Sequence, residues 1–344
     1  MIISPIRIGI VGLGRAGWGM HAQELTGREH LFHVAAACDL LPERRARFAE
    51  RFGCKVYERV EDLAADPEVE LVDIATRSVD HFAHAALALR AGKHVFLEKP
   101  MTCSFDEAAR LAEIASTSAG GLYIRQNRRY DPDFQQIQEI IASGKLGSIY
   151  QVRLARQGYA RRDDWQTLKE FGGGQLLNWG PHIIDHALRL LESPVANQYS
   201  YLKRVAAVGD AEDHLRIILT GENGRVVELE ISGGVALSEP VYRIFGDRGS
   251  LVMSGNEIHL RYLDPAVSLP ARQANPGTPG ETFGQPESLP WVEEHLPVRE
   301  GSTAIIWDEL HAAIRQGAPF RVRLEEALEV MRVVSAAKAG TPFA

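Results

Sequence analysis

The first third of the chain alternates short apolar runs with longer segments in which apolar positions recur at helical spacing. Short runs rich in Val and Ile predict strands, and the segments between them predict helices. The predicted strands are 6–11, 34–38, 71–74, 94–97 and 123–124, and the predicted helices are one ending near 28, 42–52, 81–91 and 105–116. Because strands that alternate with helices form parallel sheets covered on both faces, residues 1–124 are expected to fold as an α/β Rossmann domain.

The pattern changes after residue 124, where strand-like runs begin to follow one another directly. One predicted helix ends near residue 147, and the apolar runs after it are 150–155, 199–208, 214–219, 225–231, 242–245, 250–253 and 257–262. Consecutive strands without crossover helices predict a large, mostly antiparallel open sheet, with one face packed and the other face free. Residues 125–344 are therefore expected to form a second domain of the α+β class.

Two further segments complete the second domain. Residues 265–297 are rich in Pro and Gly and show little periodicity, so they are expected to be an irregular excursion over the surface. Helical spacing returns in 303–316 and 324–339. These two closing helices are free to pack back on the first domain.

Composition narrows the possible partners of the protein. Its 344 residues suit two domains, and a content of 45% hydrophobic and 24% charged residues is typical of a soluble globular protein. The net charge of -7 argues against nucleic-acid binding and favours a small polar molecule as the partner. The chain shows no signal peptide, no apolar run of membrane-spanning length and no close cysteine pair. These features predict a cytoplasmic protein that binds neither nucleic acid nor membrane.

A glycine-rich loop follows the first predicted strand and opens a helix. The sequence Gly12-Leu13-Gly14-Arg15-Ala16-Gly17 has the spacing G-x-G-x-x-G. Taken alone, this spacing often marks only a turn. Between a strand and a helix it is typical of dinucleotide binding, because the glycines let pyrophosphate approach the backbone at a helix N-terminus. The expected phosphate-binding residues are Gly12, Gly14, Arg15, Ala16 and Gly17.

An acidic residue stands where the second predicted strand ends. Asp39 is at about the distance from the glycine loop at which a carboxylate binds the ribose hydroxyls of NAD, and its charge would repel the 2′-phosphate of NADP. The alternative is that Asp39 caps the helix that begins near Pro42. The nearby Arg44 and Arg45 leave NADP open, so the expected cofactor is NAD, with NADP as the alternative.

Further motifs, spread over almost the whole chain, resemble one family of enzymes. They are Ala75-Thr76 with His81, Glu98-Lys99-Pro100, Asn127-Arg128-Arg129-Tyr130, Gly172-Gly173-Gly174, and His182 with Asp185. With the glycine loop, they make the chain resemble the glucose-fructose oxidoreductase, inositol dehydrogenase and rhizopine-catabolism (Gfo/Idh/MocA) oxidoreductases. The resemblance implies an NAD(P)-dependent enzyme that transfers hydride between nicotinamide and a sugar, polyol or related hydroxyl or keto compound. It also adds Thr76, Arg77, His81 and Glu98 to the expected cofactor-binding residues.

Two residues are expected to be catalytic. The resemblance places Lys99 in the active site, where an ammonium can hydrogen-bond the reacting oxygen and stabilise its negative charge. His182 follows Pro181, which suits the first turn of a helix. The macrodipole at this helix N-terminus disfavours imidazolium, so His182 is expected to be a neutral general base.

Four further residues are expected to support the site or bind substrate: Asn178, Asn127, Arg128 and Asp185. Asn178 is the main departure from the family, whose sugar and polyol dehydrogenases commonly have an aspartate there. An amide can orient a neighbour but cannot stabilise imidazolium by charge. His182 and His186 have helical i, i+4 spacing, which suits a metal, but no third ligand is evident, so no metal is expected.

The motifs leave two alternatives to an ordinary dehydrogenase open. One is a glycosidase or lyase that uses tightly held NAD for transient oxidation, a chemistry also found in this family. The other is a dinucleotide sensor without enzymatic activity. The free face of the predicted second sheet, together with the habit of the family, implies a homodimer or homotetramer that associates through that sheet.

Overall fold

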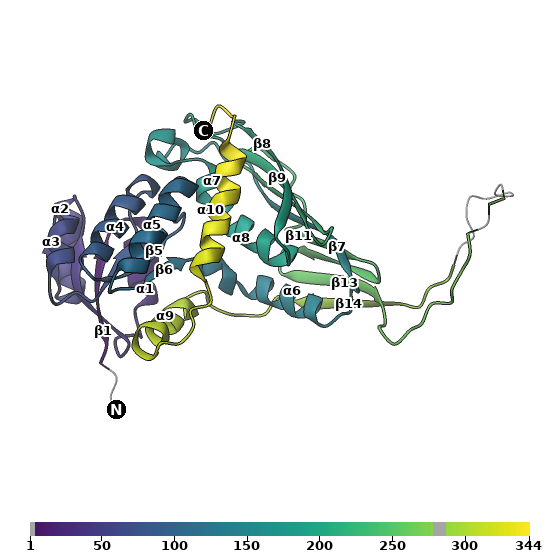
Figure 1. Cartoon of the computed structure of the whole chain (residues 1–344), viewed down its shortest axis with the longest axis horizontal. Coiled ribbons are helices and arrows are strands. Elements are labelled where there is room, and N and C mark those ends of the chain that lie inside the picture. Colours follow the sequence, from purple (N-terminus) through teal and green to yellow (C-terminus); the bar gives the residue numbers. More distant parts are fainter. Residues whose placement is uncertain (1–3, 275, 278–286) are drawn as a thin grey trace.

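The first part of the chain forms a six-stranded parallel sheet. The computed structural model describes residues 4–274, 276–277 and 287–344. The sheet has the order β3-β2-β1-β4-β5-β6. It lies in the purple and blue part of the chain at the left of Figure 1. The strands are β1 (Ile6–Val11), β2 (Phe32–Cys38), β3 (Lys55–Tyr57), β4 (Leu71–Ile74), β5 (His94–Glu98) and β6 (Leu122–Arg125). This is the expected Rossmann arrangement, in which the loops after β1, β4 and β5 meet at one edge of the sheet.

Helices cover both faces of this sheet. One apolar cluster joins the sheet to α1 (Ala22–Glu24), α2 (Pro42–Phe52) and α9 (Ile305–Gln316), and the other joins it to α3 (Val60–Ala65), α4 (His81–Arg90) and α5 (Phe105–Thr117). Burial on both faces explains the continuous apolar runs of β1 and β4. The sequence prediction missed β3 and α3, because β3 has only three residues and exposes two of them. The first helix ends at Glu24 rather than near 28.

The second part of the chain forms an eight-stranded sheet in the order β14-β13-β12-β11-β7-β10-β9-β8. The strands are β7 (Ile149–Gln157), β8 (Val195–Lys203), β9 (His214–Gly221), β10 (Val226–Ser232), β11 (Tyr242–Gly246), β12 (Gly249–Ser254), β13 (Glu257–Leu263) and β14 (Trp291–Pro297). All neighbours are antiparallel except β7 and β10. The prediction of a large, mostly antiparallel open sheet is therefore confirmed.

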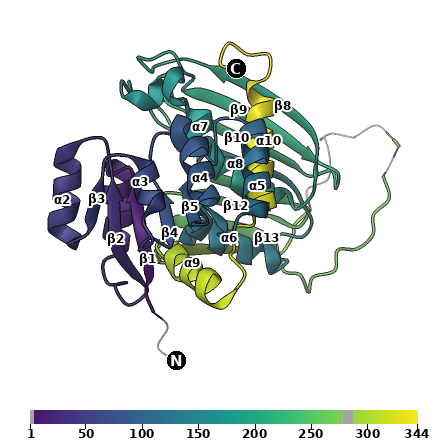
Figure 2. The ribbon, with the colours of Figure 1, turned by 60° about the vertical axis from the view of Figure 1, so that its left-hand side comes forward.

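Three helices pack on the inner face of the second sheet. They are α6 (Pro132–Ala142), α8 (Gly180–Leu191) and α10 (Leu324–Lys338), and their apolar side chains share one core with the inner positions of the strands. Figure 2 shows α8 and α10 in front of this sheet. Alternation along β9 buries Leu215, Ile217 and Leu219 while the side chains between them face outward. The outer face of the sheet is left without a helical layer in the part of the chain that the structure describes.

Two details of the sequence prediction were wrong. Residues 291–297 were assigned to an irregular excursion but form the edge strand β14, which pairs with β13. Its alternation was hidden by the Pro- and Gly-rich sequence before it, part of which (275 and 278–286) lies outside the described residues. β8 ends at Lys203 rather than 208, because the Asp213 carboxylate accepts the N–H groups of residues 205–207 and turns the chain there.

The closing helices connect the two parts. Trp307 on α9 packs edge-on against Phe32 and Phe96 of the first sheet, and α10 packs between α5 and α8. α9 thus packs back on the first domain. The division at residues 124 and 125 stays a prediction. Among the described residues, no helix is long and apolar enough to cross a membrane.

Candidate active site

The glycine loop has the geometry that a dinucleotide requires. Gly12 has a φ of 89°, and a Cβ there would lie 2.7 Å from the backbone carbonyl of Ala75. A Cβ on Gly17 would lie 2.1 Å from the Gly12 oxygen, so this glycine lets the helix pack against the turn. At Gly14, only the Arg44 side chain comes within 4 Å. The loop is therefore tight at its first and last glycines and open at the middle one, which fits the close approach of a pyrophosphate.

Asp39 joins the glycine loop to the start of α2. Its Oδ2 accepts the N–H of Leu13 at 2.8 Å, and its Oδ1 accepts the N–H of Leu41 at 2.9 Å. Arg44 Nη1 lies 3.3 Å from the same Oδ2. The Asp39 carboxylate therefore accepts backbone N–H groups both in the glycine loop and just before α2, and the Arg44 guanidinium lies beside it. Arg45 donates to the main-chain oxygen of Asp39.

A buried charged cluster, which the sequence analysis did not find, lies beneath the loop. His21 is fully buried, and its two ring nitrogens lie 2.7 Å from Asp73 and 2.9 Å from Glu98. Burial lowers the pKa of His21 more than any other single cause, but the charge of Asp73 and the hydrogen bonds to Asp73 and Glu98 together outweigh it and raise that pKa to about 9. His21 is thus an imidazolium at neutral pH. Asp73, an acidic residue inside the buried strand β4, is the sequence signal that could have indicated this cluster.

Arg125 extends this cluster across the sheet. Its guanidinium donates to Glu98 at 2.7 Å and to Glu24 at 2.5 Å, and Glu24 also accepts the indole N–H of Trp307 at 2.6 Å. The second oxygen of Glu98 accepts the backbone N–H of Lys99 at 3.1 Å. Glu98, expected among the cofactor-binding residues, thus lies in a buried network that holds the backbone of the next residue.

Lys99 extends from the end of β5 to the second domain. Its Nζ donates to the main-chain oxygen of Asn178 at 2.8 Å. Burial lowers the pKa of Lys99 to about 8, with further lowering from Arg15, Arg125 and Arg128 and opposition from Glu98. The ammonium is therefore close to its deprotonation range. Such a shifted group in a cleft is typical of functional sites.

His182 lies in the first turn of α8, where Pro181 also stands, as the sequence predicted. The side chain is buried, and its Nδ1 has no hydrogen-bond partner among the described residues. Burial lowers the pKa of His182 well below its usual value, and the charge of Lys99 lowers it further. The imidazole is therefore neutral, and it can still accept a hydrogen bond or a proton.

Two of the expected supporting residues have other partners. The Asn178 side chain accepts a hydrogen bond from Gln166 Nε2 at 3.2 Å, so it contacts a neighbouring segment rather than His182. The Asp185 carboxylate forms a buried ion pair with Arg129, at 2.9 Å from its Nε, and Arg129 also pairs with Glu326. Asp185 thus lies in an ion-pair network between α8 and α10.

The remaining expected residues lie around the same edge of the first sheet. His81 is buried between the main-chain oxygens of Pro100, at 2.6 Å, and Thr76, at 3.3 Å. Arg77 stacks on Phe171. Asn127 is buried in the short helix η3 (Asn127–Tyr130). Arg15 and Ala16 follow Gly14 in the loop, where Arg15 is exposed and Ala16 is half-buried.

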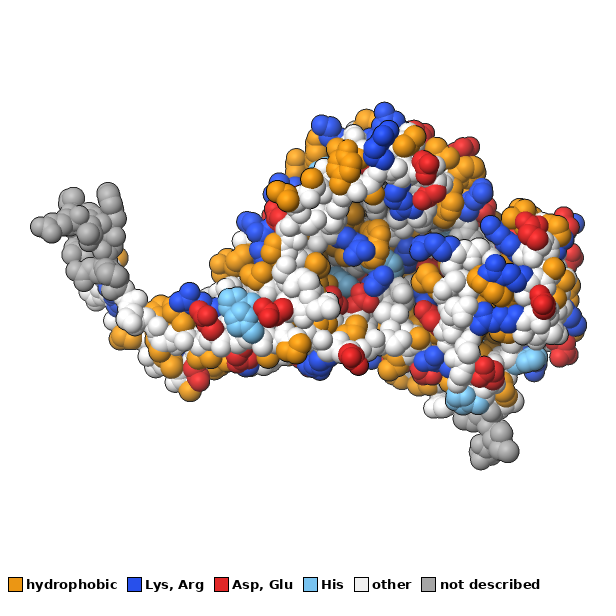
Figure 3. Space-filling model, turned by 180° about the vertical axis from the view of Figure 1, so that it is seen from behind, with side chains coloured by type: hydrophobic (Ala, Val, Ile, Leu, Met, Phe, Trp, Pro, Cys, Tyr) orange, Lys and Arg blue, Asp and Glu red, His pale blue; other side chains and the backbone are white. Residues whose placement is uncertain are grey.

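A tryptophan with two arginines borders His182. The ring centroids of Trp179 and His182 are 5.6 Å apart. The guanidinium carbons of Arg156 and Arg128 lie 3.1 Å and 5.0 Å from the Trp179 ring centroid. Figure 3 shows the molecule from the side opposite to Figure 1, where basic and histidine side chains lie in a hollow near the centre. Sequence analysis named Arg128 but missed Trp179 and Arg156, because only the fold brings β7 to the start of α8.

The histidine pair on α8 is not arranged for a metal. Both ring nitrogens of His186 are engaged, with the Tyr242 hydroxyl and the main-chain oxygen of Arg128, each at 2.9 Å. His186 also stacks on Phe134 at 3.8 Å. His186 therefore has no ring nitrogen to share with His182 for an ion.

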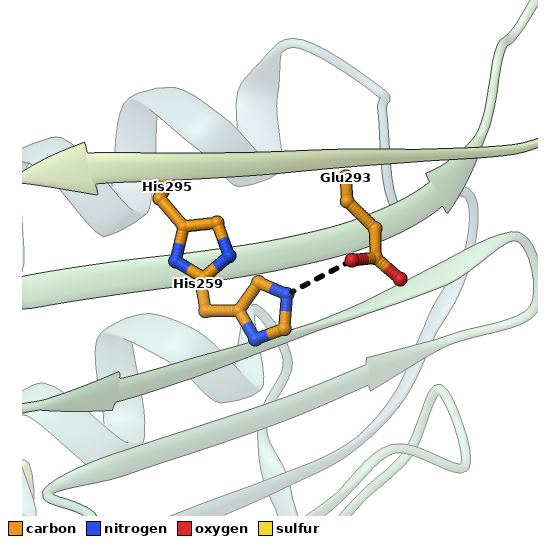
Figure 4. Close-up of side chains that lie close together, drawn as sticks. All are labelled: His259, Glu293 and His295. Carbon is orange, nitrogen blue, oxygen red and sulfur yellow. Dashed lines mark ion pairs between the residues drawn. The ribbon is translucent and has the colours of Figure 1, made fainter.

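A separate group of possible metal ligands lies on the outer face of the second sheet. Ligand atoms of His259, Glu293 and His295 all lie within 4.8 Å of one another, and Figure 4 shows them facing one space. His259 Nε2 is 4.0 Å from Glu293, and His295 Nδ1 is 2.9 Å from Glu257. These residues belong to β13 and β14, at the sheet edge farthest from β8. Sequence analysis did not single out this group.

The chain also resembles known proteins over most of its length. Scyllo-inositol 2-dehydrogenase (NADP(+)) IolW of Bacillus subtilis is 28% identical, over 97% of this chain and 93% of its own length. D-glucoside 3-dehydrogenase of Escherichia coli is 27% identical, over 70% of this chain and 73% of its own. The solved structure of the putative oxidoreductase yvaA from Bacillus subtilis has a TM-score of 0.83 at 23% identity, covering 97% of this chain and 95% of that one.

Two family models match successive parts of the chain. Residues 6–124 match the oxidoreductase family with an NAD-binding Rossmann fold. Residues 134–252 match the GFO/IDH/MocA C-terminal domain. Together these matches cover more than half of the chain and agree with the two sheets described above. The protein therefore belongs to the Gfo/Idh/MocA family of oxidoreductases.

Proposed function

We propose that the protein is an NAD(P)-dependent dehydrogenase or reductase that acts on a CH–OH group of a sugar, polyol or related hydroxyl or keto compound. The observation that carries the proposal is a neutral, buried His182 with an unpartnered nitrogen, beside a lysine ammonium at the edge of the Rossmann sheet. The names of two relatives, an inositol dehydrogenase and a glucoside dehydrogenase, support this substrate class.

The two side chains divide the work of alcohol oxidation. His182 accepts the hydroxyl proton, since its imidazole is neutral and has acceptor capacity in reserve. Lys99 donates a hydrogen bond to the same oxygen and stabilises its negative charge in a partly buried cleft. The nicotinamide of a bound cofactor supplies the hydride acceptor. In the reduction direction, the reduced cofactor would supply the hydride, protonated His182 would return the proton to the oxygen, and Lys99 would donate the same hydrogen bond.

The remaining expected residues take supporting parts in this proposal. Gly12, Gly14 and Gly17 bind the pyrophosphate with Arg15 and Ala16, and Asn127 and Arg128 border the substrate. Asn178 holds Lys99 through its main-chain oxygen. His81 fixes the loop after β4 against Pro100. These proposed roles rest on position and hydrogen bonding, and each can be tested by mutation.

We further propose that the cofactor is NAD, selected by Asp39. This carboxylate is fixed between the glycine loop and α2, where its charge would repel a 2′-phosphate. Arg44, at 3.3 Å from Asp39, is the group that would receive such a phosphate. The relative IolW is named as an NADP-dependent enzyme, so the binding of NAD and of NADP has to be compared. Dissociation constants of NADH and NADPH should be measured for the wild type and for Arg44→Gln, with NADH expected to bind the wild type more tightly.

The same measurement separates the two parts of the cofactor proposal. Arg44→Gln should weaken NADPH and leave NADH nearly unchanged, because NADH carries no 2′-phosphate. Tighter binding of NADPH than of NADH by the wild type would reject the NAD assignment, while the glycine-loop site would stand. Failure of both nucleotides to bind would reject that site as well.

The test of the enzymatic proposal is NADH formation by purified protein with a panel of sugars and polyols. Net NADH formation supports the dehydrogenase. Cleavage of a glycoside without net NADH formation would instead indicate a glycosidase or lyase that oxidises its substrate transiently. Cofactor binding without turnover of any compound would indicate a sensor.

We also propose that the protein is a homodimer or homotetramer that associates through the outer face of the second sheet. That face exposes the aromatic side chains of Tyr150, Tyr199, Tyr201 and Trp291. Large exposed aromatic residues on one face are typical of interfaces. Light scattering at micromolar concentration should give at least twice the chain mass, and a strict monomer would reject the proposal. The cytoplasmic location also stays a prediction.

A further inference from the structure

Basic side chains concentrate beside the proposed reaction centre. Arg156 comes from the end of β7, and its guanidinium carbon lies 3.1 Å from the centroid of the Trp179 ring. Arg128, from the short helix η3, lies 5.0 Å from the same centroid. Trp179 in turn borders His182, with 5.6 Å between their ring centroids. One indole thus places two guanidinium groups next to the proposed general base.

The charges of these groups are incompletely neutralised. Within the described residues, Arg156 has no ion pair and no side-chain hydrogen bond, although most arginines of the chain have a carboxylate partner. The Lys99 ammonium is held by a neutral carbonyl rather than by a carboxylate. Arg128 has a partner in Asp131, at 3.3 Å. Two like charges on one indole repel each other, and the cleft retains positive charge.

The nearby carboxylates do not remove this excess. Asp131 is already used by Arg128, and burial raises its pKa to about 6, with the Arg128 charge opposing the shift. Asp133 interacts more weakly with Arg156, and its Oδ1 accepts the backbone N–H of Phe134. Residue 178, beside Lys99, is a neutral asparagine. Burial lowers the pKa of Arg156, and the charge of Arg128 lowers it further.

We propose that the substrate carries an anionic group, a carboxylate or a phosphate, which Arg156 binds beside Trp179 with help from Arg128. This inference rests on the proposed function and narrows its substrate class to acidic sugars or polyols. A guanidinium offers two parallel N–H donors that match either oxyanion, and stacking on the indole pre-orients it. An anion there would relieve the repulsion between the two arginines. The carbon to be oxidised would then lie toward Lys99 and His182.

The experiment compares matched substrates that differ only at C6, which carries a neutral hydroxymethyl group, a carboxylate or a phosphate. The purified full-length protein with NAD is assayed with D-glucose, D-glucuronate and D-glucose 6-phosphate, and with the corresponding galactose series. We expect kcat/KM for at least one acidic member to exceed that of its neutral counterpart by about 10- to 100-fold, the range expected for hydrogen bonds to a charged group. The better of the uronate and the phosphate identifies the anion.

Three variants locate the effect. Arg156→Gln should raise KM for the acidic substrate by about 10- to 100-fold and lower kcat/KM for the neutral one by a much smaller factor. Arg156→Lys should restore part of the lost affinity for the acidic substrate, because it keeps the positive charge but not the two parallel N–H donors of the guanidinium. Arg90→Gln is the matched control. Arg90 ends α4, has no ion pair in the described part of the chain, and lies at the opposite edge of the first sheet.

The outcomes distinguish this proposal from the one on which it rests. Turnover of neutral sugars that equals or exceeds that of their acidic counterparts would overturn the anion site and leave the dehydrogenase intact. If none of the compounds is oxidised, calorimetric titration of D-glucuronate and D-glucose into the NADH-bound protein decides the matter. Equal affinities would overturn the anion site, whereas tighter glucuronate binding that Arg156→Gln abolishes would support it without catalysis. Equal losses in Arg156→Gln and Arg90→Gln would overturn it as well.

Discussion

Glu98 and Lys99 are neighbours in the chain, yet their side chains lie in two regions that differ in how charged groups are paired. Glu98 points into the buried cluster of His21, Asp73 and Arg125, where acidic and basic groups alternate at 2.7 to 2.9 Å. Lys99 points away from this cluster, and among the described residues its ammonium donates a hydrogen bond only to the main-chain oxygen of Asn178. One peptide bond thus separates a network of buried ion pairs, here called the closed network, from an ammonium without a carboxylate partner among the described residues, here called the open site.

The difference shows how the fold holds the edge of the first sheet at which the reaction centre is proposed. Ion pairs buried beneath the sheet are costly to break, since a single remaining charge would have no compensation. They hold the end of β5, because Glu98 also accepts the backbone N–H of Lys99. At the reaction centre, Lys99 has no carboxylate partner and His182 Nδ1 has no hydrogen-bond partner among the described residues, so a substrate can bind to both. Mutations in the two regions should therefore have different readouts, stability in one and turnover in the other.

The largest expected effect on stability comes from breaking the closed network. Arg125→Met should lower the free energy of unfolding by about 3–5 kcal/mol, because it removes the guanidinium that pairs with the buried Glu98 and the half-buried Glu24. Urea denaturation checks this value. Arg90→Met, at an exposed position, is the control and should change stability by less than about 0.5 kcal/mol. Equal stabilities of the two variants would show that the network does not hold the fold.

A smaller effect should appear in the dependence of stability on pH. The folded pKa of His21 is raised to about 9, above its unfolded value, so imidazolium stabilises the fold fully below about 6.5. This contribution should be lost as pH rises through about 9. Urea denaturation of the wild type between pH 6 and 10 should show the decline, and His21→Gln should flatten it. A wild-type profile that matches that of His21→Gln would contradict the assignment of charge to His21.

The smallest expected effect lies at the open site. Asn178→Asp should raise the pKa of His182, because a carboxylate one helical turn earlier favours imidazolium. The acidic limb of the pH profile for oxidation should then move to higher pH. An unmoved limb would show that residue 178 does not act on His182, in line with the hydrogen bond of its side chain to Gln166.

The sequence predicted the features of the molecule that depend on local pattern. The glycine loop, the end of β5 with Lys99, and His182 in the first turn of α8 all follow from residues close together in the chain. The buried cluster did not, since it joins His21, Asp73 and Arg125 from three distant segments. Arg156 stands on an ordinary alternating strand, and only the packing of β7 against α8 brings it to Trp179.

The short strand β3 and the edge strand β14 escaped prediction for a different reason. Neither strand is well buried, so neither has the apolar run that marks the central strands. Both lie at edges of their sheets, where one side lacks a neighbouring strand. Their existence depends on backbone pairing with β2 and β13 rather than on their own apolar side chains.

The central claim is that Lys99 and His182 form the reaction centre. It is tested most directly by measuring turnover of the best substrate by Lys99→Ala and His182→Ala, with folding and NADH affinity of each variant determined in parallel. The account predicts that each substitution lowers kcat by about 10²- to 10⁴-fold, while the variants stay folded and bind NADH as the wild type does. Turnover near that of the wild type in both variants would contradict it.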